Sequence, residues 1–157
     1  MTARLLTELR CGNERELWEK LGVDRMARVS AKHPQAREQT WYVQSLYSVW
    51  RIGTREVAYG EGTGAGTYLE SVEHPLAGVS SLADLDRYEW PNPDDWDVSG
   101  LRADCMAWHD YPILLGSYEP FLLYCRLRGM ELAFSDLIEQ PDLADAILDR
   151  IHAIHDR

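Results

Sequence analysis

Apolar residues recur at intervals of three and four along much of the chain, which is the spacing of one face of an α-helix. Gly22 follows the second such segment and marks its end. Pro120 precedes the longest segment, where a proline suits the first helical turn. The pattern predicts helices over residues 3–10, 14–21, 99–109 and 121–138, and a last helix that starts at Pro141. A shorter helix over 82–87 is predicted by Ser81, which can cap it.

Two short apolar segments predict strands. Residues 26–30 are partly β-branched and run into a loop, while residues 111–116 form a compact apolar run that ends in glycine and predicts a buried strand. Residues 40–67 mix aromatic, β-branched and polar residues, which predicts an antiparallel β excursion. Glycine takes every second position from 60 to 66, so the spacing does not fit a dinucleotide loop and favours a hairpin or lid loop over a phosphate cradle.

The order of these elements predicts the fold class. Helices that alternate with two central strands are typical of a parallel α/β architecture. Eight strand-helix units take about 250 residues, so 157 residues are too few to close a barrel. We therefore predict that residues 1–157 form a single domain, a partial (β/α)8 TIM barrel with an antiparallel β excursion.

Composition narrows the function classes. The formal charge of -10 would repel a phosphate backbone, so nucleic acid is excluded as a partner. No run of 18 apolar residues occurs and the first twenty residues carry many charges, so neither a membrane span nor a secretory leader is expected. Cys11, Cys105 and Cys125 lack any Cys-x-x-Cys spacing, which favours reduced thiols over disulfides or a thiolate zinc site. We expect a cytoplasmic protein.

Several segments resemble one known family when they are taken in order. They lie at residues 16–24, 49–53, 56–60, 64–70, 72–77, 82–88, 90–94, 99–101, 114–116, 120–131 and 141–151. In this order they resemble the uroporphyrinogen decarboxylase family, in particular its divergent branch, which includes cobalamin-dependent methyltransferase relatives. The resemblance covers nearly the whole chain.

The resemblance implies a single (β/α)8 barrel of roughly twice this length, of which this chain would be an N-terminal portion. The family's second strand carries an essential aspartate, whereas residues 26–31 contain no acid. Where the family has a pocket tyrosine, this chain has Cys125, next to Tyr124. The zinc ligands of the methyltransferase branch lie in the other half of the barrel. The catalytic residues are therefore unknown, and no cofactor or metal is predicted for this chain.

Candidate binding residues follow the two central strands, because ligands of parallel barrels bind at the carboxyl ends of the strands. These residues are Ser117, Tyr118 and Glu119 after the later strand and His33 after the earlier one. Tyr124, one turn into the next helix, can reach the same rim. Loop and capping roles are the alternative for these positions, and a buried tyrosine bonded to backbone is the alternative for Tyr124.

Other titratable residues have structural interpretations that we favour. Cys105 and His109 are four apart on a predicted helix, but they would lie at the amino-terminal face of a barrel, where residues serve stability. Asp149, His152 and His155 fit a solvated polar stripe better than a metal site. Arg126 and Arg128 lie near a helix C-terminus, where cations are stabilised.

Two functional hypotheses remain. The first is a fragment of a barrel enzyme, a lyase or methyltransferase that acts on a tetrapyrrole or a corrinoid-linked methyl group, with the chain itself catalytically incomplete. The alternative is a non-catalytic half-barrel that binds or assembles. An unclosed parallel sheet exposes strand edges and apolar faces, so we predict a homo-oligomer or a complex with a complementing chain.

Overall fold

The computed structural model describes residues 2–36, 47–115 and 119–157. Their contacts divide the chain into two compact units. Unit 1 comprises residues 1–31 and 98–116, and unit 2 comprises residues 32–97 and 117–157. No helix in the described ranges is long and apolar enough to cross a bilayer.

Unit 1 begins with two helices. They are α1 (Thr2–Glu8) and α2 (Glu14–Leu21). The side chain of Asn13 accepts a hydrogen bond of 3.0 Å from the Glu16 amide, and the Glu16 carboxylate accepts one of 2.7 Å from the Gly12 amide. This reciprocal capping satisfies amides that a helix start leaves without partners. Gly22 ends α2 with a φ of 62°, which confirms its predicted role.

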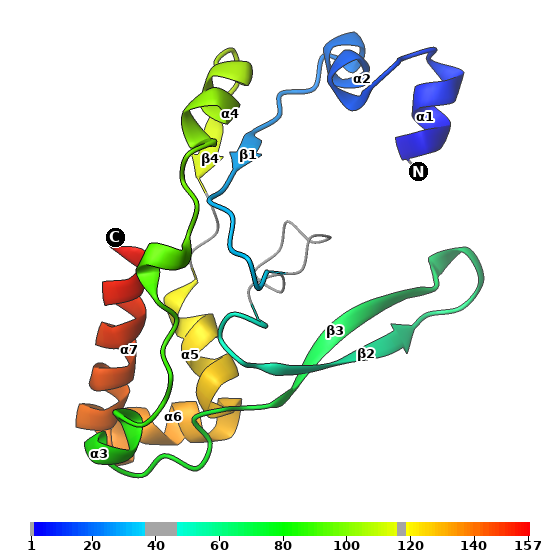
Figure 1. Ribbon diagram of the computed structural model, residues 1–157. Coiled ribbons are helices and arrows are strands. Elements are labelled where there is room, and N and C mark those ends of the chain that lie inside the picture. The colour runs from blue at the N-terminus through cyan, green and yellow to red at the C-terminus, as the bar shows by residue number, and fades with distance from the viewer. Residues whose placement is uncertain (1, 37–46, 116–118) are drawn as a thin grey trace. The chain divides into compact units, whose positions relative to one another are not determined.

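The two predicted central strands pair in parallel within unit 1. They are β1 (Ala27–Val29) and β4 (Ile113–Leu115), and α4 (Leu101–Ala107) precedes β4 (Figure 1). The register aligns Ala27 with Ile113 and Val29 with Leu115. A parallel pair together with helices confirms the α/β class.

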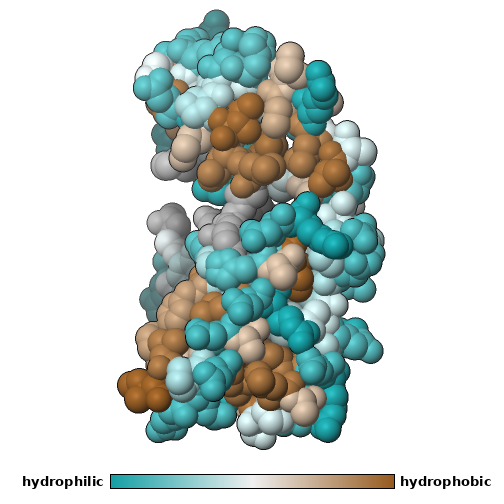
Figure 2. Space-filling model, turned by 90° about the vertical axis from the view of Figure 1, so that its left-hand side faces the viewer, coloured by the Kyte–Doolittle hydropathy of each residue, from teal (hydrophilic) through white to brown (hydrophobic). Residues whose placement is uncertain are grey.

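The predicted burial of the later strand is wrong. Ile113 is 39% exposed and Leu115 65% exposed, whereas Ala27 and Val29 of β1 are buried. The physical reason is that β4 has a single neighbouring strand among the described residues. Apolar surface in this part of the chain is visible in the upper half of Figure 2.

Unit 2 contains the predicted antiparallel excursion. Strands β2 (Gly53–Tyr59) and β3 (Gly66–Glu73) form a hairpin, closed by the turn η2 (Gly62–Gly64). Gly60 and Gly62 have positive φ, which explains why glycine is used in the connection. The hairpin-loop interpretation of the glycine run is confirmed, although Gly66 itself already belongs to β3.

The prediction of β structure just before the hairpin is wrong. Residues 47–51 form turns, in which the Ile52 amide donates to the Tyr47 carbonyl at 2.8 Å and Arg51 has a φ of 54°. Tyr47, Val49 and Trp50 are buried in this turn. Their aromatic and β-branched character serves the core rather than a strand. The earlier part of the predicted excursion, residues 40–46, lies outside the described residues.

Three helices and two shorter ones complete unit 2. They are α3 (Leu82–Leu85), η3 (Pro93–Asp95), α5 (Pro120–Arg128), α6 (Met130–Glu139) and α7 (Pro141–His155). Ser81 caps α3 as predicted, by accepting from the Asp84 amide at 3.2 Å. The single helix predicted over 121–138 is wrong, because Gly129 interrupts it. With a φ of 87° and a ψ of 135°, Gly129 leaves the helical region and turns the chain between α5 and α6.

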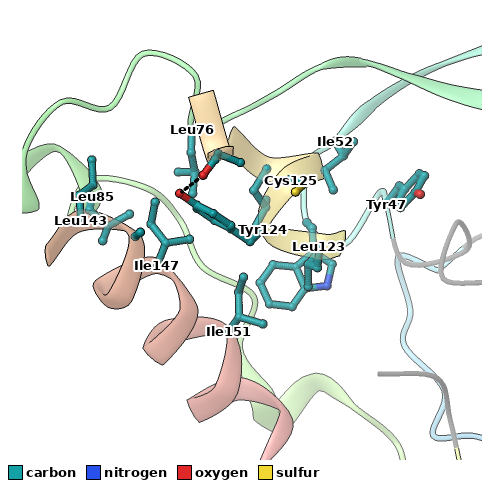
Figure 3. Packing of buried hydrophobic residues seen from close by; sticks show 14 of the residues in the cluster. Tyr47, Ile52, Leu76, Leu85, Leu123, Tyr124, Cys125, Leu143, Ile147 and Ile151 are labelled. Carbon is teal, nitrogen blue, oxygen red and sulfur yellow. Dashed lines mark hydrogen bonds between the residues drawn. The ribbon is translucent and has the colours of Figure 1, made fainter. Parts of the chain in front are cut away.

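The largest hydrophobic core of the described residues packs α5 against α7. Leu123 and Tyr124 of α5 meet Ile147 and Ile151 of α7, and Leu76 joins them from the loop after β3 (Figure 3). Each of these side chains is at most 4% exposed. Full burial of such a side chain stabilises the fold by about 1.5 to 3 kcal/mol. The amphipathic face predicted for the last helix therefore anchors unit 2.

Candidate functional site

The binding rim predicted after β4 is only partly within the described residues. Ser117 and Tyr118 lie outside them. Glu119 is exposed at the start of α5, and its side chain makes no capping hydrogen bond. Its carboxylate is therefore open to solvent, where it can accept hydrogen bonds from a polar ligand.

Tyr124 lies in the core of unit 2 and is fully buried. Its hydroxyl is 3.1 Å from Asp136 Oδ2 and 3.3 Å from the Ala133 carbonyl oxygen, and it donates its hydrogen bond to these acceptors. Burial, and next the Asp136 carboxylate, raise the pKa of Tyr124, so the phenol stays neutral. Binding a ligand through this hydroxyl would require the core to open. The observed environment is the one expected for a structural tyrosine.

A buried ion pair lies beside Tyr124. Arg128 Nε donates to Asp136 Oδ2 at 2.6 Å and Nη2 donates to Oδ1 at 3.2 Å, with both side chains at most 3% exposed. Arg128 Nη1 also donates to the carbonyl oxygens of Leu76 and Val79, at 2.7 and 2.6 Å. The guanidinium therefore ties the loop after β3 to helices α5 and α6. Removing one partner of such a buried pair leaves an uncompensated charge.

The position of Arg128 near a helix C-terminus predicts a structural role but does not predict its partner. Asp136 is eight residues further on, so in a continuous helix the two residues would lie about 12 Å apart along the axis, too far for a direct ion pair. The break at Gly129 turns α6 back so that Asp136 meets Arg128. Gly129 interrupts an otherwise apolar helical pattern, and the acid Asp136 follows at a position where that pattern would be buried. Together these two features could have indicated the pair.

His33 is nearly buried in a different part of unit 2, at 8% exposure. Its Nδ1 accepts a hydrogen bond of 3.2 Å from the Gln35 amide, and its ring lies 4.5 Å from that of Trp96. Burial lowers the pKa of His33, and the nearby Asp95 carboxylate opposes this only in part. His33 is therefore a neutral imidazole at neutral pH, with Nδ1 occupied as an acceptor.

A short backbone pairing lies next to His33. The Lys32 amide donates to the Asp97 carbonyl oxygen at 3.0 Å, and the Asp97 amide donates to the Lys32 carbonyl oxygen at 2.7 Å. His33 and Trp96 directly adjoin these two residues in the sequence, and their rings contact each other at an interplanar angle of 60°. This arrangement gives His33 a structural environment, while a role in ligand binding stays a prediction.

The candidate metal ligands are not gathered into a site. In the described part of the chain, no group of three or more His, Cys, Asp or Glu residues could hold a metal ion. His109 Nδ1 lies 2.9 Å from the Met106 carbonyl oxygen. His155 stacks on Trp50 at 5.8 Å between ring centroids, and its Nδ1 lies 2.9 Å from the Ile151 carbonyl oxygen. Burial lowers the pKa of His155.

Two further polar side chains of α5 are affected by burial, the thiol of Cys125 and the guanidinium of Arg126. Burial raises the pKa of the Cys125 thiol, so the reactive thiolate is disfavoured. Arg126 Nε is buried and has no hydrogen-bond partner among the described residues.

Comparison with known proteins adds no assignment. No family model matches the chain, and neither curated proteins nor solved structures give a match. The resemblance to the uroporphyrinogen decarboxylase family therefore stays a prediction.

Proposed function

We propose that this chain forms an arc of a parallel (β/α) barrel like that of the uroporphyrinogen decarboxylase family. The observation that carries the proposal is the parallel pair β1–β4, whose β4 residues Ile113 and Leu115 stand 39% and 65% exposed. Parallel sheets are covered by helices on both faces and consist of buried strands. A two-stranded parallel sheet with bare apolar residues is therefore expected to continue into further strands.

The element order supports a barrel rather than an isolated pair. In unit 1, α4 leads into β4, and β4 lies parallel to β1. Helices that connect parallel strands in this way are the repeating unit of α/β barrels. The residues after β4, including Glu119, would then face the ligand at the rim of the completed barrel.

The proposed enzyme acts on a polar small molecule, either a tetrapyrrole or a corrinoid-linked methyl group. Glu119 is the described candidate for a contact with substrate, because its carboxylate is exposed at the start of α5. No catalytic residue is assigned to this chain, since residues 26–31 carry no acid and Tyr124 is engaged in the core. The reacting groups would come from the strands that complete the barrel.

A second candidate function is non-catalytic assembly. It is favoured by the same exposed β4 residues and by the structural surroundings of Tyr124 and His33. In this case a second copy or a complementing chain covers β4 and the complex serves as a scaffold. Apolar burial of about 25 cal/mol per Å² would drive such an association.

The two candidates share a test at β4. Leu115→Lys places a charge on the exposed strand, and Leu82→Lys makes the same change on α3, where Leu82 is 54% exposed. We expect the unaltered chain to self-associate at micromolar concentration in size-exclusion chromatography with light scattering. Leu115→Lys should shift it towards the monomer, and Leu82→Lys should leave it unchanged. A well-folded monomer of the unaltered chain would overturn assembly through β4.

Ligand titration separates the enzyme from the scaffold. Uroporphyrinogen and methylcobalamin are added separately to the purified chain, and binding is followed through tryptophan fluorescence. We expect saturable binding of one of them, weakened by Glu119→Gln if the rim contacts the ligand. Binding of neither ligand would contradict the enzyme candidate and leave the scaffold.

A further inference from the structure

The β2–β3 hairpin carries its aromatic residues on one face. Alternate residues of a strand point to opposite faces of a sheet, and the register pairs Arg55 with Glu70, Val57 with Tyr68 and Tyr59 with Gly66. We call these six residues the aromatic face. The opposite face consists of Thr54, Glu56, Ala58, Thr67, Leu69 and Ser71.

The side chains of the aromatic face hold one another in place. The rings of Tyr59 and Tyr68 lie 6.2 Å apart between centroids. A methyl group at Gly66 would lie 2.7 Å from the Tyr59 hydroxyl oxygen, so Tyr59 lies across this glycine. Arg55 Nη2 donates to Glu70 Oε2 at 2.6 Å. A surface ordered in this way loses little side-chain entropy when it binds a partner.

This face is uncovered in unit 2. No residue of β2 or β3 is buried, and Tyr59 and Tyr68 are 54% and 45% exposed. Figure 1 shows the hairpin reaching away from α5, α6 and α7. A two-stranded hairpin in water is marginally stable without a layer packed on it. The aromatic face therefore has the properties of a surface that a partner covers.

We propose that the aromatic face docks onto the same face of a second copy of this chain, related by a two-fold axis. Sheets pack face to face through interdigitated side chains, and tyrosine is enriched in protein interfaces. A two-fold interface requires a self-complementary surface. The aromatic face meets this requirement because it carries one cation and one anion, so Arg55 of each copy, while paired with its own Glu70, can also donate to Glu70 of the other.

Charge and size define the expected complex. The acids Glu56 and Glu61 lie on the opposite face and at the turn, so the net charge of -10 is not concentrated on the aromatic face. Two half-exposed tyrosines contribute about 100 Å² each. This is well below the roughly 800 Å² per partner of a stable complex. The dimer is therefore weak and depends on concentration.

The first experiment compares two neighbouring residues. Tyr68→Glu alters the aromatic face, and Thr67→Glu makes the same change on the opposite face of the same strand, at an exposed position. Both changes are made in the Leu115→Lys chain, so that association through β4 does not contribute, and sedimentation velocity over a rising concentration series measures the dissociation constant. We expect at least a tenfold weakening for Tyr68→Glu and no change for Thr67→Glu. Equal effects of the two variants, or a monomer of the Leu115→Lys chain at every concentration, would overturn the proposal.

A second experiment exchanges the charges of Arg55 and Glu70, and it separates loss of the interface from a general disturbance of the hairpin. In the Leu115→Lys chain, Arg55→Glu and Glu70→Arg each leave the aromatic face with two like charges, so each chain alone should lose the remaining self-association. An equal mixture should regain it, because opposite faces then meet. Failure of the mixture to associate would refute face-to-face docking. The outcome is distinguishable from the proposed function, because Leu115→Lys acts on β4 of unit 1 and leaves the hairpin intact.

Discussion

Unit 2 builds a hydrophobic core around helices α5 and α7, whereas unit 1 leaves one of its two strands exposed. Ile147 and Ile151 of α7 are fully buried, but Ile113 and Leu115 of β4 are exposed. The core of unit 2 joins α5, α6 and α7, which are close in sequence, to residues such as Trp50, Leu76 and Leu85. A parallel strand is buried only when it has neighbours on both sides and layers on both faces. The difference teaches that apolar residues are buried where several elements meet and stay exposed on a strand that has one neighbour among the described residues.

The largest loss of stability is expected when the buried ion pair of unit 2 is broken. Arg128→Met should lower the free energy of unfolding by about 3 to 5 kcal/mol, because Asp136 is left buried and unpaired. Arg126→Met, two residues away, removes a guanidinium whose Nε has no partner and should change it by less than about 1 kcal/mol. Urea unfolding of both variants measures the difference. Similar losses of unfolding free energy in the two variants would show that the pair with Asp136 does not set Arg128 apart from Arg126.

A pair of isoleucines compares the two units directly. Ile147→Ala leaves a cavity in the α5–α7 core and should cost about 2 to 5 kcal/mol. Ile113→Ala, on the exposed strand, should cost about 1 kcal/mol or less in the monomer. Thermal and urea unfolding at low and high protein concentration provide the measurement. A cost at Ile113 that grows with concentration would indicate that β4 becomes buried on association.

The smallest expected effect is a pH dependence in unit 2. Burial lowers the pKa of His33 and of His155 below the ordinary value of 6.5, so the unfolded chain binds protons more readily than the folded one. Their stabilising contribution is full above about pH 6.5 and falls as the pH drops towards the lowered folded-state pKa. Urea unfolding between pH 7.5 and about 5 should show this loss. The His33→Gln, His155→Gln double variant should show a shallower slope, and an unchanged slope would assign the effect to other groups.

Much of the local structure could be predicted because its causes are local. Gly22 ends α2, Ser81 caps α3, and the glycine run closes a hairpin, each through the chemistry of a few neighbouring residues. The parallel pairing of β1 and β4 also followed from the alternation of strands and helices.

The failures have non-local causes. One long helix was predicted through Gly129 because the apolar spacing continues on both sides of it. The turn at Gly129 brings Asp136 to Arg128, a tertiary contact that the local pattern does not reveal. Trp50 was assigned to a strand by its residue type, but the core holds it in a turn. Of the candidate site, Tyr124 and His33 have structural surroundings that depend on Asp136 and Trp96, which are distant in sequence.

The backbone pairing of Lys32 with Asp97 closes residues 32–97 at their base, much as a terminal base pair closes a nucleic-acid stem. Because both ends of this segment meet at one point, the tip of its hairpin can vary in length without changing how the segment closes. Two backbone hydrogen bonds thus fasten the segment at its root, while Trp50, Leu76 and Leu85 fasten its middle to the core of unit 2.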